Sequence, residues 1–96
     1  MVLPLEGLTV VAVEQAVAAP FATARLADAG ARVIKVERPD TGDDGRAWGP
    51  PFWGGEGTMF LSANAGKRSL ALSLRDPRGR EALLRLVDGA DIFLQS

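Results

Sequence analysis

The chain has 96 residues, a length that accommodates at most one small domain. It contains no cysteine and no histidine, which excludes disulfides and the common zinc sites, and we expect no bound metal. The formal net charge of −1 gives no electrostatic indication of nucleic-acid binding. The start lacks the features of a signal peptide, and no apolar run approaches the length that spans a bilayer. We therefore expect a cytoplasmic protein with neither a nucleic-acid nor a membrane partner.

The first third of the chain predicts a βαβ unit. Residues 8–13 form a short, valine-rich apolar run, typical of a strand buried on both faces of a parallel sheet. A helix is expected to begin at Pro20 and to run through Ala29, and Gly30 can adopt the left-handed conformation that ends it. Residues 31–37 form a second β-branched run. Strand, helix and strand over about 30 residues are the spacing of a βαβ unit.

Residues 38–66 have a different composition, because their many glycines and prolines prevent any long regular element. A loop of this length inside a compact domain usually has a function or is disordered. Its aromatic residues argue against disorder, since disordered segments are poor in them. We expect an ordered loop packed against another part of the protein. The aromatic residues are Trp48, Phe52, Trp53 and Phe60.

Regular structure is expected to return at residues 68–74. Leu70, Leu72 and Leu74 alternate there with small or polar residues, the pattern of a half-buried strand. Asp76 and Pro77 then predict the start of a helix, as its N-cap and its first residue.

This second helix has one apolar stripe, formed by Leu83, Leu86 and Val87, and Gly89 is expected to end it. Residues 91–94 follow as a fourth strand. The predicted order is β-α-β-loop-β-α-β. It indicates an α/β fold, a Rossmann-like parallel-sheet fragment over residues 1–96 that ends directly after a strand, where the ligand-lining loop of such a sheet would follow.

A dinucleotide site is the first candidate for function. Glu37 ends the second strand, where a ribose-binding carboxylate is expected. However, no glycine lies between Val13 and Phe21, where the phosphate-binding turn requires three. Conventional NAD binding is therefore disfavoured, and Glu37 is interpreted as a strand-end acid paired with Arg38 or Arg46.

Catalysis by residues of this chain is the second candidate. The chain has no cysteine or histidine and no Gly-x-Ser-x-Gly elbow. Asp43 and Asp44 are neighbouring carboxylates, but in a glycine-rich loop such residues more often form turns than an acid–base pair. We predict no catalytic residue within these 96 residues.

Phosphate recognition is the third candidate. Arg38 and Arg75 directly follow the second and third predicted strands, at the edge where open parallel sheets bind ligands. Coenzyme A, ATP or a sugar phosphate would each suit several separated cations. The alternative for the basic last third is a solvated helix face. The candidate cations are Arg38, Arg46, Lys67, Arg68 and Arg75.

Five ordered blocks of the chain carry a family resemblance. They are residues 5–11 with 18–20 and 26–39; residues 42–44 with Arg46 and residues 49–50; Phe60 with Asn64; residues 66–70; and residues 76–80, with residues 90–91 closing the match. These blocks resemble the opening of class III CoA-transferases, a family that includes formyl-CoA, carnitine-CoA and succinyl-CoA-type transferases and the α-methylacyl-CoA racemases. The resemblance covers essentially the whole chain.

The resemblance implies two-domain enzymes that form an interlocked homodimer of ring-like subunits and act on an acyl-CoA and a carboxylic acid. It also implies a nucleophilic aspartate downstream of this chain, so that the chain is an N-terminal portion that holds coenzyme A and is inactive alone. Several positions depart from the family pattern, among them Val17, where some transferases have glutamine. The positions that match the family's coenzyme A contacts are Val17, Ala18, Arg38, Leu72, Ser73, Leu74, Arg75 and Ser96.

Two alternatives remain open at this point. The first is an α-methylacyl-CoA racemase, although racemases of the family tend to have a shorter segment before the block Gly66-Lys67-Arg68-Ser69. The second is a CoA- or nucleotide-binding module without catalytic activity. Proton exchange at the α-carbon would indicate the racemase, and saturable binding by an isolated monomer would indicate the module.

Overall fold

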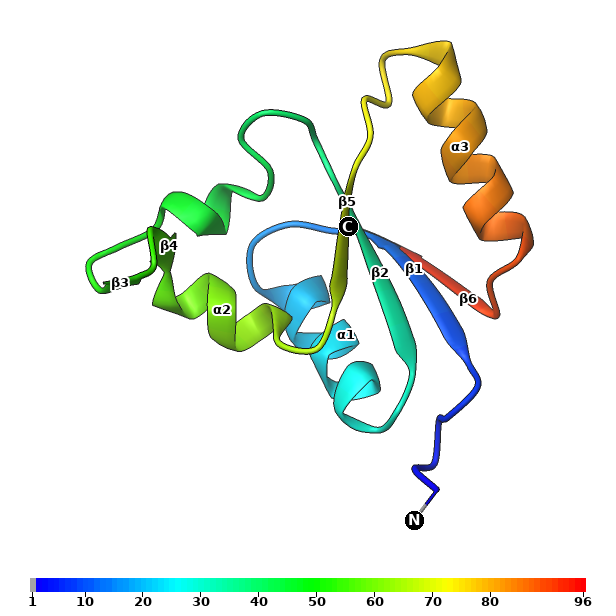
Figure 1. Cartoon of the computed structure of the whole chain (residues 1–96), viewed down its shortest axis with the longest axis horizontal. Helices are drawn as coiled ribbons and strands as arrows, with labels where there is room; N and C mark the ends of the chain where they lie inside the picture. Colours follow the sequence, from blue (N-terminus) through cyan, green and yellow to red (C-terminus); the bar gives the residue numbers. More distant parts are fainter. Residues whose placement is uncertain (1) are drawn as a thin grey trace.

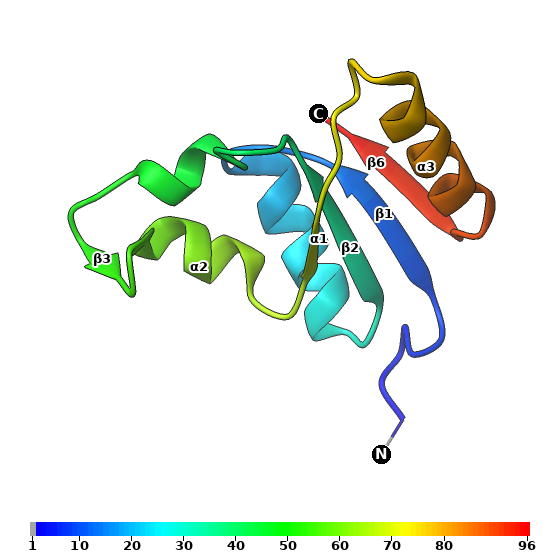
Figure 2. The same ribbon diagram turned by 45° about the horizontal axis from the view of Figure 1, so that its top comes forward.

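The computed structural model, which describes residues 2–96, is a mixed α/β fold around one parallel sheet, as expected (Figure 1). Its strands lie in the order β5-β2-β1-β6 and all neighbours are parallel. Two longer helices, α1 and α3, lie on opposite sides of this sheet (Figure 2). These elements are β1 (Thr9–Val13), α1 (Ala18–Asp28), β2 (Arg32–Glu37), β5 (Arg68–Ala71), α3 (Pro77–Asp88) and β6 (Ile92–Gln95).

The strand order reverses direction between β1 and β6. The chain adds β2 and then β5 on one side of β1, and α3 then leads back to β6 on the other side. In open α/β sheets such a reversal leaves a crevice outside the carboxyl ends of the strands, where ligands bind. The fold therefore directs attention to the residues that follow β1, β2, β5 and β6.

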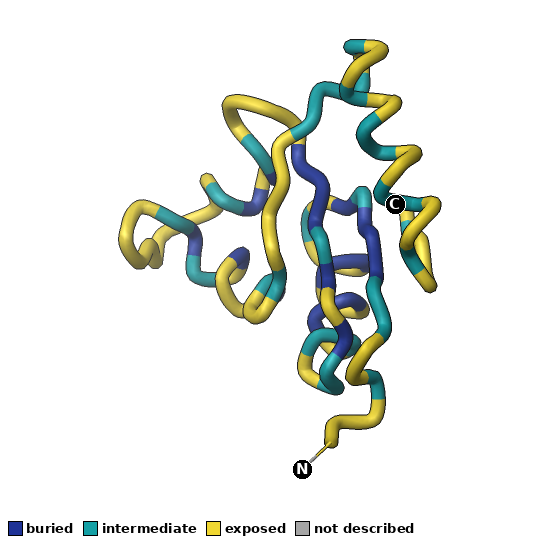
Figure 3. The backbone as a smooth tube through the Cα atoms, turned by 45° about the vertical axis from the view of Figure 1, so that its right-hand side comes forward, coloured by how far each residue is buried: buried dark blue, intermediate teal, exposed yellow. Residues whose placement is uncertain are grey.

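The core lies between the central strands and α1. Val10, Ala31 and Val33 are buried, and Leu5, Leu26 and Ala27 pack against them. Figure 3 shows that burial concentrates in β1, β2 and α1, while β5, α3 and β6 are largely exposed. The valine-rich runs thus form the central strands because only there are both faces covered.

The segment between β2 and β5 is ordered, as predicted. It contains a short 3-10 helix, a two-stranded antiparallel hairpin and one further helix, which packs against α1 with Phe60 and Ala63 buried. The sequence did not predict this helix, because it spans seven residues between glycines. The elements are η1 (Asp44–Ala47), β3 (Phe52–Trp53), β4 (Glu56–Gly57) and α2 (Thr58–Asn64).

The boundaries differ from prediction at two elements. Helix α1 begins at Ala18 rather than at Pro20, which occupies the first turn, where its missing N–H costs no hydrogen bond. Strand β5 ends at Ala71, so residues 72 and 73 are irregular and residues 74 and 75 form a turn instead of continuing the strand. Gly30 follows α1 with a φ of 106°, the left-handed backbone that the sequence predicted.

One prediction of burial was wrong for residues 2–96, the half-buried pattern of the third predicted strand. All four residues of β5 are exposed, because β5 is an edge strand without a covering helix here. Helix α3 begins with Asp76 as its N-cap and ends at Gly89, as predicted, but none of its residues is buried. Its stripe of Leu83, Leu86 and Val87 remains partly exposed.

The described part of the chain, residues 2–96, contains no helix with the length and apolar character needed to cross a bilayer.

Candidate functional site

A cleft of about 550 Å³ opens at the carboxyl ends of all four strands of the main sheet. Its size and its place at the reversal of strand order are typical of ligand sites in α/β proteins. The lining consists of Val13, Glu14, Gln15, Val36, Glu37, Arg38, Pro39, Asp40, Thr41, Gly42, Asp43, Leu72, Ser73, Leu74, Arg75 and Ser96.

The cleft brings together most of the residues that the sequence predicts as coenzyme A contacts. Arg38 follows β2, residues 72–75 follow β5, and Ser96 follows β6, so the sheet gathers three distant segments at one edge. Val17 and Ala18 lie instead at the start of α1, exposed to solvent and outside this lining. Two backbone hydrogen bonds, Leu72 N to Glu37 O at 3.0 Å and Ser96 N to Val13 O at 3.0 Å, hold the lining in place.

The two candidate phosphate-binding arginines differ in their surroundings. The Arg38 guanidinium donates to Gly42 O at 2.9 Å and to Gln15 Oε1 at 3.1 Å, and it forms an ion pair with Asp44. Within residues 2–96, Arg75 makes no ion pair, and its carbonyl accepts from the Arg80 side chain at 3.1 Å. Arg75 thus presents an uncompensated positive charge at the cleft, while Arg38 is held in one orientation.

A buried ion cluster lies beneath the cleft, formed by Glu14, Lys35, Asp43 and Lys67. Lys35 Nζ lies 3.1 Å from Glu14 Oε2 and 2.9 Å from Asp43 Oδ2. Lys67 Nζ lies 2.7 Å from Glu14 Oε2. The side chains are at most 2% exposed, and two carboxylates balance two ammonium groups. Such burial requires charge pairing, because an unpaired charge in this environment is strongly unfavourable.

Neutral groups supply further hydrogen bonds to Glu14 and Lys67 in this cluster. Thr23 donates to Glu14 Oε1 at 2.5 Å, and Lys67 donates to Asn64 Oδ1 at 2.8 Å and to Pro20 O at 2.9 Å. The pKa of Lys67 is lowered because burial outweighs its hydrogen bond to Glu14. Lys67 is therefore a structural residue, and its assignment as a phosphate-binding cation is wrong.

Asp43 anchors the segment after β2 to the end of β1. Its Oδ1 accepts from Gly45 N at 2.8 Å, the turn-forming role that the sequence predicts, and from Ala16 N at 3.1 Å. Burial would raise the pKa of Asp43, but hydrogen bonds from Lys35 and from these backbone groups outweigh it and lower the pKa. Sequence reasoning missed the ion pair, although Lys35 lies inside an apolar β-branched run and signals a buried charge that needs a partner.

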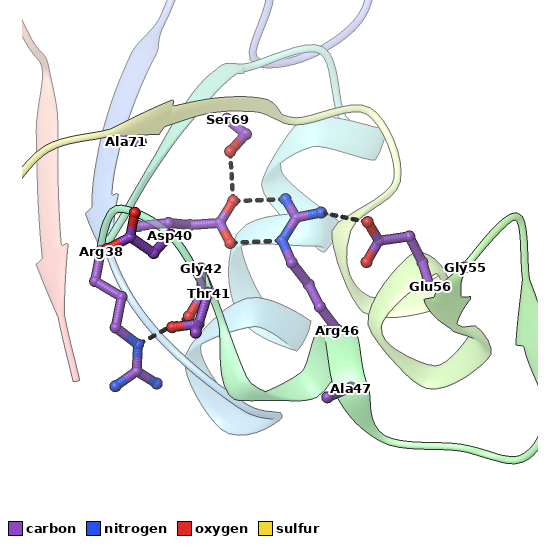
Figure 4. A pocket seen from close by; sticks show the side chains of 11 residues that line it. Arg38, Asp40, Thr41, Gly42, Arg46, Ala47, Gly55, Glu56, Ser69 and Ala71 are labelled. Carbon is purple, nitrogen blue, oxygen red and sulfur yellow. Dashed lines mark hydrogen bonds and ion pairs between the residues drawn. The ribbon is translucent and has the colours of Figure 1, made fainter.

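Glu37 at the end of β2 is paired with Arg46, one of the two partners that the sequence left open (Figure 4). Arg46 Nε and Nη2 donate to its two oxygens at 2.8 and 2.7 Å, Asp43 N donates at 2.7 Å, and Ser69 donates as well. Arg46 also contacts Glu56 at 3.1 Å. Neither Glu37 as a ribose ligand nor Arg46 as a phosphate ligand fits this geometry, because both side chains are already bound.

Through the Glu37 carboxylate, the stability of the folded protein is expected to change with pH in the acid range. Burial would raise its pKa, but hydrogen bonds from Arg46, Ser69 and Asp43 N outweigh it and lower the pKa from 4.5 to about 2. A depressed folded-state pKa adds stability above the unfolded value and loses it as the pH falls toward the folded value. From about pH 5 to about pH 2.5, we expect the intact protein to lose more stability than a Glu37→Gln variant. Urea unfolding at a series of pH values measures this, and parallel losses in the two proteins would contradict it.

No metal centre is apparent in the part of the chain that the structure describes. Among residues 2–96, no three or more histidine, cysteine or acidic side chains are grouped so that they could hold a metal ion. The cleft lining combines acidic, basic, neutral polar and apolar side chains with backbone groups.

Residues 5–96 match the family described as CoA-transferase family III. Among the curated relatives, the human succinyl-CoA:glutarate CoA-transferase is 47% identical over 93 residues, which are 97% of this chain and 21% of the relative. The succinate–glutarate CoA-transferase of Agrobacterium fabrum is 44% identical over 97% of this chain and 25% of its own length. The acetyl-CoA:oxalate CoA-transferase of Acetobacter aceti is 39% identical over 97% of this chain and 24% of its own length.

Solved structures give the same result for the fold. A CAIB/BAIF family protein from Brucella suis superposes with a TM-score of 0.93 at 43% identity, over 99% of this chain and 26% of that protein. A hypothetical protein from Mycobacterium tuberculosis superposes with a TM-score of 0.84 at 40% identity, over 95% of this chain and 24% of that protein. The chain thus spans between a fifth and about a quarter of the length of these relatives.

Proposed function

Because this chain belongs to CoA-transferase family III, we propose that it forms the coenzyme A-binding cleft of an enzyme that moves coenzyme A from an acyl-CoA to a carboxylic acid. The observation that carries the proposal is the convergence of Arg38, residues 72–75 and Ser96 around one cleft at the reversal of strand order. The nucleophile is proposed to come from the remainder of the full-length enzyme, and this chain supplies positioning.

The chemistry of the cleft suits an adenine nucleotide. Three of its acids, Glu14, Glu37 and Asp43, are neutralised by internal cations, so their charge does not repel an anion. The unpaired guanidinium of Arg75 is available to a phosphate. Leu72 and Leu74 provide apolar surface in the same lining, which suits a purine ring.

The names of the relatives suggest the first substrates to test. Relatives from human, Agrobacterium and Haloarcula marismortui act on succinyl-CoA or succinate, paired with glutarate or mesaconate. We therefore propose succinyl-CoA as donor and a dicarboxylic acid such as glutarate as acceptor. Transfer of coenzyme A between them by the full-length enzyme is the expected activity, whereas α-proton exchange without transfer would favour a racemase and overturn the proposal.

Arg75 gives the sharpest binding test. We expect Arg75→Met in the full-length enzyme to raise the Kd for coenzyme A about tenfold or more, because a charge-assisted phosphate contact is lost. Arg78→Met is the matched control, since the Arg78 side chain is 90% exposed, pairs with Asp76 and lies outside the cleft. Isothermal titration calorimetry measures both, and an equal Kd for the two variants would contradict the assignment.

The assembly and location of the full-length enzyme are further proposals. We propose a homodimer, as the family resemblance suggests, and a cytoplasmic location, as expected from the sequence. Analytical ultracentrifugation of the full-length enzyme tests the first, and a monomer at micromolar concentration would contradict it. Cell fractionation tests the second.

A further inference from the structure

We propose that Gln15 is a ligand-binding residue of the cleft whose side-chain NH₂ group donates a hydrogen bond to an anionic oxygen of the acyl-CoA. The proposal rests on the proposed function, because it requires an acyl-CoA in the cleft. Gln15 directly follows Glu14 at the end of β1, next to the reversal of strand order, and it lines the cleft.

The backbone of Gln15 is fixed on both sides by the buried ion cluster. Glu14 is 2% exposed and is held by Thr23, Lys35 and Lys67. Ala16 donates its N–H to Asp43 Oδ1 at 3.1 Å and has a φ of 69°. Gln15 itself remains exposed between these two anchored residues, so its side chain is presented to the cleft from a rigid support.

The side-chain amide of Gln15 has a defined orientation. Arg38 Nη2 lies 3.1 Å from Gln15 Oε1. Because a guanidinium can only donate, the amide oxygen must face Arg38, and the NH₂ group is left as the free donor. Arg38 is fixed in turn by Gly42 O and Asp44 (Figure 4 shows the contact with Gly42). Gln15 and Arg38 therefore form one preorganised unit.

The chemistry of this unit selects an anionic oxygen. It combines the neutral amide donor of Gln15 with the guanidinium of Arg38, whose charge is offset in part by its exposed ion pair with Asp44. An amide N–H and a guanidinium N–H both bind phosphate or carboxylate oxygens more strongly than neutral carbonyls. An acyl-CoA offers both, in its phosphates and, for succinyl-CoA, in the terminal carboxylate of the acyl group. Binding of coenzyme A, acetyl-CoA and succinyl-CoA distinguishes the two sources.

The test uses two substitutions of Gln15 in the full-length enzyme. Gln15→Met keeps the shape and removes both the donor and the acceptor, whereas Gln15→Glu keeps the acceptor for Arg38 and removes the donor. The matched control is Gln95→Met, since Gln95 is the other glutamine, is exposed on β6 and lies outside the cleft. Calorimetry with the three thioester or thiol ligands gives the Kd of each variant.

We expect both Gln15 variants to raise Kd about tenfold or more while the control is unchanged. A loss for all three ligands identifies a phosphate oxygen, and a loss confined to succinyl-CoA identifies its carboxylate. If Gln15→Glu keeps the wild-type Kd for all three, Gln15 serves only as an acceptor for Arg38 and the proposal is overturned. The proposal is also overturned if Gln15→Met keeps the wild-type Kd for all three ligands. If the wild-type enzyme binds none of the ligands, the proposed function itself fails, which is a different result.

Discussion

Replacing Lys35 with methionine is expected to lower the free energy of unfolding by about 3–5 kcal/mol, because it leaves buried carboxylates without a partner. Lys35 is 1% exposed and contacts both Glu14 and Asp43. Methionine fills a similar volume, so the loss arises from the unpaired charges of Asp43 and Glu14 and not from a cavity. Asp43 depends most on Lys35, whereas Glu14 retains its contact with Lys67.

Urea unfolding of the full-length enzyme, followed by circular dichroism, measures this loss. Arg32→Met is the matched control, because Arg32 lies on the same strand with an exposed side chain and should change stability by less than about 0.5 kcal/mol. An Asp43→Asn substitution in the Lys35→Met background is expected to recover part of the stability, since it removes one unpaired charge and keeps the oxygen that accepts from Gly45 N and Ala16 N. Equal unfolding curves for Lys35→Met and Arg32→Met would show that the cluster does not stabilise the fold.

Replacing Arg46 with methionine is expected to lower the free energy of unfolding by about 2–3 kcal/mol. This loss is smaller than the one expected for Lys35→Met because Arg46 is partly exposed. The variant removes both donors to Glu37, the contact with Glu56 and the stacking of the guanidinium at 4.2 Å from the Phe60 ring centre. Arg46→Lys is expected to restore only a small part, since an ammonium group cannot form the two-pronged contact.

Thermal unfolding of the wild-type protein, Arg46→Met and Arg46→Lys ranks their stabilities. Arg85→Met is the control, because its ion pair with Glu81 joins two side chains that are 79% and 64% exposed and is expected to contribute about 0.5 kcal/mol or less. Wild-type stability in Arg46→Lys would show that the two-pronged contact with Glu37 is not needed. If Arg46→Met loses as little stability as Arg85→Met, Arg46 does not stabilise the fold.

The sequence predicted the main strands and helices well because their signals are local. The valine-rich run of β1, the Asp76-Pro77 start of α3 and the glycines after both helices each depend on a few neighbouring residues. The position of the cleft could be predicted from the topology, since parallel strands place the residues that follow them at one edge of the sheet. This is why Arg38 and residues 72–75, distant in sequence, were predicted to lie together.

The remaining features depend on contacts across the chain, which a pattern of neighbouring residues does not contain. Lys67 was assigned to phosphate because its partner Glu14 is 53 residues away. The half-buried pattern of β5 and the stripe of α3 describe surfaces that residues 2–96 do not cover. Val17 and Ala18 matched the family pattern, yet they lie outside the cleft lining, so their assignment as coenzyme A contacts stays a prediction.

A crystal structure of the full-length enzyme with bound coenzyme A decides whether this cleft is the nucleotide site. We expect nucleotide density in the cleft at the carboxyl ends of the strands, with a phosphate at Arg75 and adenine against residues 72–74. Nucleotide density elsewhere, for example in the neighbouring cavity of about 470 Å³ beside Arg46 and Glu56, would contradict this expectation.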